Sequence, residues 1–207
     1  MAILDRKIFL ASRSPRRREL LRQIGVGHEL LQLREDPKRG IDVDETPHAG
    51  ETPRDYALRV ATAKAAAGLH AVARRANSMI RPVLAADTTI ELEGAIIGKP
   101  VDAADAKRIL NALSGRSHTV ITVVAMAFAD RLETRISEST VTMRALDDAL
   151  IRRYIESGEP MDKAGAYAVQ GRAAAFITRI EGSYSGIMGL PLAETVELLA
   201  AFDIESV

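Results

Sequence analysis

Short apolar runs alternate with helix-like patterns along the chain, so strands and helices are expected to alternate as well. Strands are predicted over Lys7–Ala11, Pro82–Leu92, Ala95–Gly98, His118–Ala129, Leu132–Met143 and Phe176–Ile180. Helices are predicted to begin at Ser14, Thr52, Asp102, Asp147 and Pro191. Turn signals at Glu93-Gly94 and Asp130-Arg131 predict two hairpins, which interrupt a purely parallel pattern. We therefore expect an α/β fold in which helices flank a mixed, twisted sheet.

Three arginines follow the predicted start of the first helix. Ser14 suits the N-cap, yet Arg16, Arg17 and Arg18 fill the first turn. A helix N-terminus carries partial positive charge and favours carboxylates over cations. Arg16 and Arg17 are understandable there if a polyanion docks on the helix end, where free backbone N–H groups and guanidinium forks would share it. For Arg18 we expect plain exposure to solvent.

Composition narrows the classes of function. The 207 residues include 28 Lys and Arg and 28 Asp and Glu, which disfavours a general nucleic-acid binder because such proteins are normally basic. The absence of cysteine excludes disulfides, thiolate nucleophiles and zinc–thiolate sites. Any metal would be held by carboxylates, histidines or substrate oxygens, which favours Mg²⁺ or Mn²⁺. Neither a membrane-spanning run nor a signal-peptide pattern is visible, so we expect a cytoplasmic protein without a membrane partner.

Asp87 follows the apolar run 83–86, where a carboxylate is costly unless it is paired or binds a ligand. We interpret its position as the end of a buried strand, where α/β sheets commonly bind ligands. A purely structural carboxylate is an equally good interpretation of this residue alone. If Glu93-Gly94 is a two-residue turn, Lys99 lies across from Thr88 and beside Asp87. Lys99 would then serve either to bind an anion or to form an ordinary cross-strand ion pair.

Other polar residues offer weaker signals. Lys64 lies on the apolar side of its predicted helix, so it either extends to water or faces a polar site. Asp44 and Glu45 lie in the long loop Arg34–Glu51 and are of the kind that binds Mg²⁺, although acidic loop pairs are usually just solvated. The Gln170 amide suits a base edge as well as an ordinary loop hydrogen bond. The chain has no P-loop and no dinucleotide-binding glycine motif, so a nucleotide would be bound in another way.

Seven motifs resemble, in order and spacing, those of the Maf family of nucleoside triphosphate pyrophosphatases. They are LASRSPRRRELL, VDETP, AADTTI, GKP, LSGRSH, DKAGAYAVQG and GSYSGIMGLPL, and the resemblance covers nearly the whole chain. The resemblance implies one domain over residues 1–207, with two lobes around a central cleft and a fold similar to inosine triphosphate pyrophosphatases. It also implies hydrolysis of a nucleoside triphosphate to the monophosphate and pyrophosphate, a divalent cation (Mg²⁺ or Mn²⁺) and often a homodimer.

The resemblance implies roles for individual residues. Asp87 is similar to the catalytic base of the family and, with Glu45, to ligands of the divalent cation. The substrate-binding positions that it implies are Ser12, Arg16, Arg17, Lys64, Thr88, Lys99, Asp162, Lys163 and Gln170. Arg16, Thr88 and Gln170 match the branch that acts on dTTP and UTP, whereas the 7-methyl-GTP branch tends to have Trp, Gln and Glu at these positions.

Two alternative functions stay open at this point. One is hydrolysis of 7-methyl-GTP, and the other is a nucleotide-responsive regulator of cell division or septum formation that acts through partner binding. An intact pair of Asp87 and Lys99 would favour an enzyme, because a pure sensor would not need it. The loop Leu33–Gly40 is longer than in compact family members, which leaves the geometry of a lid open.

Overall fold

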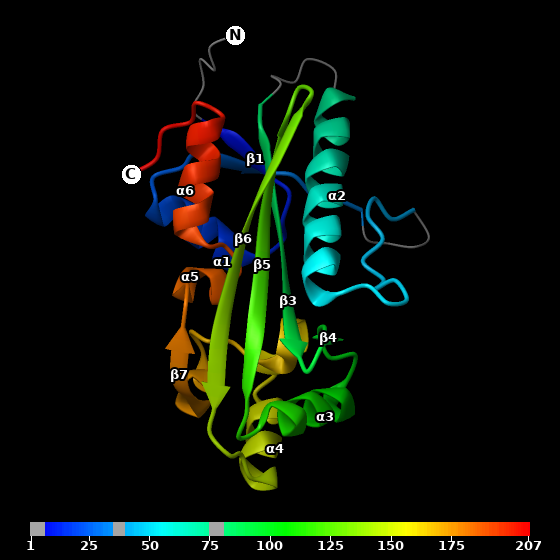
Figure 1. The fold of residues 1–207 in the computed structure, drawn as a ribbon, viewed down its shortest axis with the longest axis vertical. Coiled ribbons are helices and arrows are strands. Elements are labelled where there is room, and N and C mark those ends of the chain that lie inside the picture. The colour runs from blue at the N-terminus through cyan, green and yellow to red at the C-terminus, as the bar shows by residue number, and fades with distance from the viewer. Residues whose placement is uncertain (1–6, 35–39, 75–80) are drawn as a thin grey trace.

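A mixed β-sheet forms the centre of the computed structural model, which describes residues 7–34, 40–74 and 81–207 (Figure 1). The strand order is β2-β1-β3-β5-β6-β7, and β4 pairs with the far end of β3. β1 is parallel to β2 and β3, and the remaining pairs are antiparallel. The strands are β1 (Ile8–Leu10), β2 (His28–Leu30), β3 (Val83–Leu92), β4 (Ala95–Ile97), β5 (Ser117–Phe128), β6 (Arg131–Met143) and β7 (Ile177–Glu181). The predicted α/β fold with a mixed sheet is confirmed.

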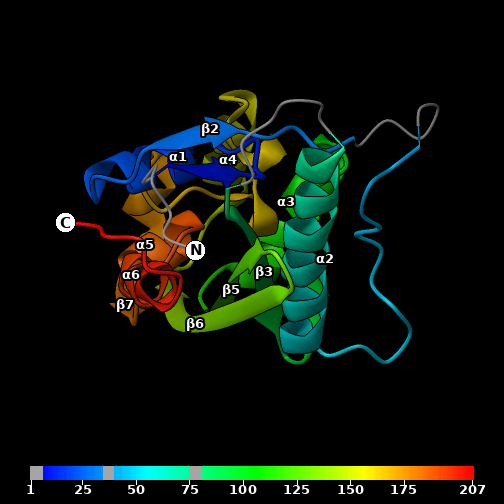
Figure 2. The same cartoon turned by 90° about the horizontal axis from the view of Figure 1, so that it is seen from above.

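Helices cover both faces of this sheet (Figure 2). They are α1 (Pro15–Gln23), α2 (Pro53–Ala73), α3 (Ala103–Leu113), α4 (Asp148–Glu156), α5 (Tyr184–Met188) and α6 (Leu192–Ala201). α2 packs over one buried cluster on one face of the sheet. α1 and α6 pack together over a second buried cluster on the other face. α3 and α4 form a third cluster at the far end of β3, β5 and β6. In the described residues, no helix is both long and apolar enough to cross a membrane.

Alternation along β3 decides which face each of its side chains reaches. Val83 and Ala85 belong to the cluster under α2, whereas Leu84 and Ala86 belong to the cluster under α1 and α6. Because side chains alternate in a strand, Asp87 points to the α2 face and the next residue to the opposite face. A buried strand thus delivers two adjacent polar residues to different sides of one sheet.

The sheet has a gap beside the middle of β3. On that edge, β1 pairs only with Val83 and Leu84, and β4 pairs only with Ile90–Leu92. Asp87 therefore lies in the middle of β3 and not at the end of a strand, which corrects the sequence-based interpretation. The strand that ends near Asp87 is its neighbour β1, so the carboxylate still lies beside the carboxyl end of a parallel strand.

Several local predictions were wrong. The short strand β2 was not predicted, because three residues give too little periodicity to detect. The segment 182–189, predicted to be a loop, contains the five-residue helix α5, which Ser183 caps through a hydrogen bond to the N–H of Gly186. α2 ends at Ala73 rather than near His70. The predicted loop Leu33–Gly40 lies partly outside the described residues.

Candidate functional site

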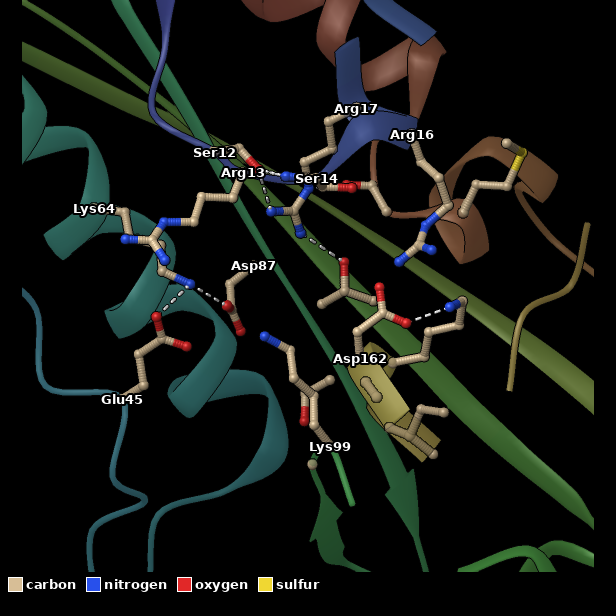
Figure 3. Close-up of a pocket in the computed structure, with 18 of the residues that line it drawn as sticks. Ser12, Arg13, Ser14, Arg16, Arg17, Glu45, Lys64, Asp87, Lys99 and Asp162 are labelled. Atoms are coloured by element: carbon tan, nitrogen blue, oxygen red, sulfur yellow. Dashed lines mark hydrogen bonds and ion pairs between the residues drawn. The ribbon is translucent and has the colours of Figure 1, made fainter. Parts of the chain in front are cut away.

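A cavity of about 580 Å³ opens at the gap between β1 and β4 (Figure 3). Its lining residues come from the segment 11–17 and α2 as well as from β4 and the segment 162–170. All the substrate, catalytic and metal positions expected from the sequence line it: Ser12, Arg16, Arg17, Glu45, Lys64, Asp87, Thr88, Lys99, Asp162, Lys163 and Gln170. Among the described residues, seven lysines and arginines but only three carboxylates line this cavity, and the excess of positive charge suits a polyanion.

Lys64 connects the two carboxylates on the α2 side of the cavity. Its Nζ donates a 2.8 Å hydrogen bond to Asp87 Oδ1 and lies 3.0 Å from Glu45 Oε1. Asp87 and Lys64 are largely buried, with side-chain exposures of 9% and 15%, whereas Glu45 is 40% exposed. Lys64, on the apolar side of α2, therefore faces a polar site and does not extend to water.

Lys99 reaches the cavity by the expected hairpin register. Leu92 pairs with Ala95 and Ile90 with Ile97, and the same register continued brings Lys99 level with Thr88. Figure 3 shows the Lys99 ammonium extending toward Asp87. No ion pair joins Lys99 to Asp87 within the described part of the chain, so Lys64 takes the place predicted for Lys99 in that pair.

The Arg-rich start of α1 lines the opposite wall. Ser14 is the N-cap residue, but its side chain makes no capping hydrogen bond, contrary to expectation. The first turn has no acidic residue, so its N–H groups stay available to an anion. Arg16 and Arg17 both border the cavity, whereas Arg18 does not. Arg18 is half-buried rather than freely exposed, because its neighbours cover Nε.

Arg17 binds neutral groups from three different segments. It donates to Gly189 O at 2.7 Å from Nε, to Ser12 Oγ at 3.2 Å from Nη1 and to Thr88 Oγ1 at 3.2 Å from Nη2. Burial lowers the pKa of Arg17 from its ordinary value, against the attraction of Asp87. Because its acceptors are neutral, its positive charge stays free to attract an anion in the cavity.

Thr88 and Thr122 form a buried polar pair behind Arg17. They face each other across β3 and β5, and their hydroxyl oxygens lie 3.0 Å apart. Thr122 Oγ1 also lies 2.8 Å from Gly186 O in α5. Carbonyls of the segment 182–189 thus hold both Arg17 and Thr122, which accounts for the presence of this glycine-rich segment at the cavity.

The segment 162–170 closes the remaining side. Lys163 Nζ bonds to Glu159 O at 2.8 Å and also to Asp162, so its charge is partly neutralised. Gln170 is exposed at the rim. A side chain at Gly171 would collide with the Glu159 carboxylate. This carboxylate accepts hydrogen bonds from the N–H groups of Arg172 and Ala173. The tight path at Gly171 therefore fixes where Gln170 lies.

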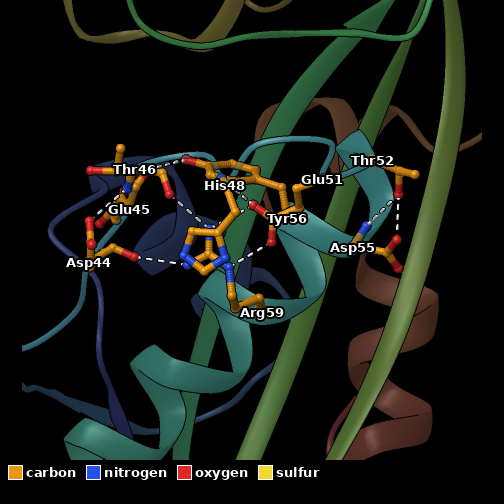
Figure 4. Close-up of polar contacts among 9 residues, drawn as sticks. All are labelled: Asp44, Glu45, Thr46, His48, Glu51, Thr52, Asp55, Tyr56 and Arg59. Carbon is orange, nitrogen blue, oxygen red and sulfur yellow. Dashed lines mark hydrogen bonds and ion pairs between the residues drawn. The ribbon is translucent and has the colours of Figure 1, made fainter.

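Arg59 holds the loop that carries Glu45 (Figure 4). It forms two hydrogen bonds to Glu51, at 2.6 and 2.8 Å, and one each to the carbonyls of Asp44 and Thr46, both at 3.0 Å. The Tyr56 hydroxyl donates to the carbonyl of Glu45 itself at 3.0 Å. Burial and the nearby charges of Asp87 and Glu45 raise the pKa of Tyr56. Three consecutive carbonyls around Glu45 are thus fixed to α2.

Sequence reasoning missed several residues of the cavity and its support. Arg13, Tyr56 and Met188 line the cavity, and Arg59 and Thr122 lie behind residues that do. Arg13 had a detectable signal, since it stands in the same Arg-rich stretch as Arg16. Thr122 had none, because a threonine inside an apolar strand is an ordinary strand residue.

A family model described as Maf-like protein matches residues 7–202. The chain belongs to the Maf-like protein family. A dTTP/UTP pyrophosphatase of Aromatoleum aromaticum is 57% identical to it over 203 residues, which are 98% of this chain and 98% of the relative. dTTP/UTP pyrophosphatases of Dechloromonas aromatica and Nitrosomonas europaea are 54% and 52% identical, each over 93% of this Maf-like chain and over 96% and 92% of the relatives. The family resemblance seen in the motifs is confirmed.

Among solved structures, the Staphylococcus aureus Ham1 protein covers 95% of this Maf-like chain and 97% of its own, with 18% sequence identity and a TM-score of 0.44. A score this low does not establish a common fold. The α/β architecture of the Maf-like chain is therefore taken from its own sheet and helices, and its similarity to inosine triphosphate pyrophosphatases stays a prediction.

Proposed function

We propose that this chain hydrolyses the α–β phosphoanhydride of dTTP and UTP, releasing the nucleoside monophosphate and pyrophosphate and so clearing these nucleotides from the pool. The observation that carries the proposal is Asp87, a buried carboxylate on the wall of a cavity otherwise dominated by cations. Relatives that are more than 50% identical to the chain over nearly their full length are named dTTP/UTP pyrophosphatases, which supports the choice of substrate.

The triphosphate would be neutralised from two sides. Arg16, Arg17 and the free N–H groups of α1 lie on one wall, and Lys64 and Lys99 lie on the other. Positioning and charge stabilisation are most of what phosphoryl chemistry requires of a protein. The phosphate chain is therefore expected to lie between α1 and Asp87.

Asp87 is the proposed general base. Lys64 engages Oδ1, and among the described residues no side chain or N–H group donates a hydrogen bond to Oδ2. Oδ2 would accept a proton from a water molecule while the oxygen of that water attacks the α-phosphorus. The bond from the α-phosphorus to the bridging oxygen would break, and pyrophosphate would leave. Lys64 would hold the carboxylate in place during this step.

The residues present fit a divalent cation. Asp87 and Glu45 converge on the same point, now taken by the Lys64 ammonium. The described residues contain no group of three or more His, Cys, Asp and Glu side chains that could hold a metal ion. Mg²⁺ is commonly bound by one or two carboxylates, with phosphate oxygens and water completing its shell, so Asp87 and Glu45 suffice. A bound Mg²⁺ or Mn²⁺ would neutralise phosphate charge and acidify a water molecule.

Pyrophosphate release from dTTP, UTP, CTP, 7-methyl-GTP, ITP and dATP, with Mg²⁺ or Mn²⁺, tests the proposal. Wild type is expected to favour dTTP and UTP, and Asp87→Asn is expected to lose roughly 10²–10⁴-fold in turnover with its fold intact. Asp203→Asn, an exposed residue outside the cavity, is the control. Near-normal turnover by Asp87→Asn would remove Asp87 from this role, and a preference for 7-methyl-GTP would overturn the substrate assignment.

Three further expectations from the family resemblance stay predictions. They are the single domain over residues 1–207, the homodimer and a cytoplasmic location.

A further inference from the structure

Glu159 follows α4 and does not line the cavity, yet its carboxylate accepts hydrogen bonds from three donors. Oε1 lies 2.9 Å from the Tyr154 hydroxyl oxygen and 3.4 Å from the backbone nitrogen of Ala173, and Oε2 lies 3.1 Å from the backbone nitrogen of Arg172. A carboxylate offers only acceptor sites, so all three contacts run in the same direction. One side chain therefore joins α4 to the turn that follows Gln170.

The Tyr154 end of this connection is held firmly. Tyr154 is 3% exposed, and its ring packs edge-on against Phe176 with the ring centroids 5.0 Å apart. The backbone of Ala168, in the middle of the cavity-lining segment 162–170, also hydrogen-bonds the Tyr154 hydroxyl. Because this core side chain is fixed, the carboxylate of Glu159 carries a fixed position from α4 to the N–H groups that donate to it.

Gly171 lies directly against the same carboxylate. A Cβ atom at this position would come within 2.4 Å of Glu159 Oε1 and 2.7 Å of Oε2. The φ of Gly171 is −104°, outside the left-handed region, so space rather than backbone conformation requires glycine here. The carboxylate thus determines the path of the chain between Gln170 and Arg172.

The earlier part of the segment 162–170 has anchors that do not depend on this carboxylate. The N–H of Gly165 donates to Gly98 O at 3.0 Å. Lys163 Nζ bonds to the backbone carbonyl of Glu159, which a change of the side chain leaves in place. Loss of the carboxylate is therefore expected to release Gln170 and its turn rather than the whole segment.

Gln170 is exposed at the rim of the cavity, and its amide can offer both a donor and an acceptor to a nucleotide base. We infer that Glu159 is a positioning residue for base recognition, whose carboxylate holds Gln170 in the place from which its amide reaches the base. The inference rests on the proposed function and on the role expected for Gln170. Because the phosphate chain is expected to bind between α1 and Asp87, this role concerns the base and not the phosphates.

Glu159→Gln tests the inference, since it keeps the length and shape of the side chain. Whichever oxygen is replaced, the new amide N–H₂ group faces the N–H of Arg172 or Ala173, and two donors repel each other. KM for dTTP is expected to rise about tenfold while kcat stays within about twofold, because binding of the base weakens equally in the ground state and the transition state. The inhibition constant of inorganic triphosphate, which has no base, is expected to stay unchanged.

A matched control is Glu156→Gln, at the exposed end of α4 and outside the cavity. It makes the same chemical change three residues earlier and is expected to keep the wild-type KM for dTTP. If Glu159→Gln weakens inorganic triphosphate as much as dTTP, its role is merely structural and the inference is overturned. An unchanged KM for dTTP would overturn it as well.

Gly171→Ala disturbs the same contact from the other side. Its methyl group must displace the Glu159 carboxylate from its donors, so KM for dTTP is expected to rise with the inhibition constant of inorganic triphosphate unchanged. This variant keeps the inference testable if Glu159→Gln does not fold. A wild-type KM for dTTP in Gly171→Ala would count against the inference.

A double-mutant cycle shows whether Glu159 acts through Gln170. If it does, Glu159→Gln raises KM for dTTP in the wild-type background but has no further effect in the Gln170→Ala background. Independent, multiplying effects of the two changes on KM would overturn the inference.

The proposed function and this inference fail in different ways. If wild type releases pyrophosphate from no nucleotide, the proposed function fails, and binding of dTTP and of inorganic triphosphate is then measured by calorimetry. Glu159→Gln must still weaken dTTP about tenfold and leave inorganic triphosphate unchanged, and equal dTTP binding by wild type and variant would overturn the inference. If wild type hydrolyses dTTP and Glu159→Gln keeps the wild-type KM, only the inference fails.

Discussion

Lys64 on α2 and Asp87 on β3 form an ion pair of 2.8 Å that is largely shielded from solvent. The same ammonium group contacts Glu45, so one lysine holds the two carboxylates that would bind a metal ion. A cation between two carboxylates does by itself part of what a divalent ion would do, because it relieves their mutual repulsion. Lys64 and a metal ion are therefore expected to compete for this place before substrate binds.

Replacing Lys64 tests that competition. Lys64→Met keeps most of the side-chain volume but removes the charge, so Mn²⁺ is expected to bind more tightly to the variant in the absence of nucleotide, while kcat/KM for dTTP falls by about 10²-fold. Titration of Mn²⁺ by electron paramagnetic resonance measures the first effect directly. Lys99→Met is the control for Mn²⁺ affinity, since Lys99 makes no ion pair with either carboxylate in the described chain. Weaker Mn²⁺ binding by Lys64→Met would contradict the argument.

Arg59 is expected to matter although it lies outside the cavity. Its hydrogen bonds to the carbonyls of Asp44 and Thr46 fix the loop on both sides of Glu45. Arg59→Met is therefore expected to make this loop more susceptible to proteolysis and to weaken Mn²⁺ binding, with the preference among nucleotide bases unchanged. Arg54→Met is a suitable control, because Arg54 lies on the same helix and, among the residues that the structure describes, makes only a long, exposed ion pair of 3.6 Å with Glu138. Equal proteolysis of the two variants would exclude a specific role for Arg59.

The sequence was informative where chemistry depends on local spacing. The register of the Glu93-Gly94 hairpin follows from turn geometry, so the approach of Lys99 to the cavity could be predicted. The place of Lys64 also followed from helical periodicity, although its two alternatives could not be separated, because the partner residues lie on distant segments. A contact between Lys64 and Asp87 depends on how α2 packs on β3, which no local pattern specifies.

Other parts of the site could not be predicted for the same reason. The gap beside Asp87 exists because β1 is only three residues long and β4 pairs only with the far end of β3. Strand pairing over such separations is a property of the whole sheet. The helix α5 is five residues long, and it matters to the site because the carbonyl of Gly186 within it meets Thr122 and the carbonyl of Gly189 just after it meets Arg17. Sequence motifs identified these segments through family resemblance rather than through physical pattern.

Arg16 is expected to influence which nucleotide is accepted. It borders the cavity at the first turn of α1, next to Arg17, whose guanidinium is fixed by three hydrogen bonds. Arg16→Trp replaces a cation by a large aromatic surface, so the preference should shift away from dTTP in the nucleotide panel. Arg22→Trp, at the exposed end of the same helix, controls for the introduction of a tryptophan. An unchanged nucleotide profile of Arg16→Trp would refute a role in selection.

His118 is expected to make stability depend on pH. It is buried on β5, where Nε2 contacts the Tyr167 hydroxyl at 2.8 Å. Burial lowers the pKa of His118 to about 4, against the attraction of Glu91. Above about pH 6.5 the imidazole is neutral in both the folded and the unfolded chain, so it adds no pH dependence there. As the pH falls from 6.5 to 4, the unfolded chain binds a proton that the folded chain refuses, and stability decreases.

His118→Phe removes this titration while filling a similar volume. The substitution also removes the hydrogen-bond partner of the Tyr167 hydroxyl. Burial raises the pKa of this hydroxyl and keeps it neutral over the whole pH range, so the effect of the lost partner does not vary with pH. That loss is a constant offset. Between pH 7 and pH 4, wild type is therefore expected to lose on the order of 3 kcal/mol more unfolding free energy than His118→Phe does. Urea unfolding at pH 7, 5.5 and 4 measures the difference, with the exposed His48→Gln as control. Parallel losses in wild type and His118→Phe would mean that His118 is protonated in the folded chain as readily as in the unfolded one.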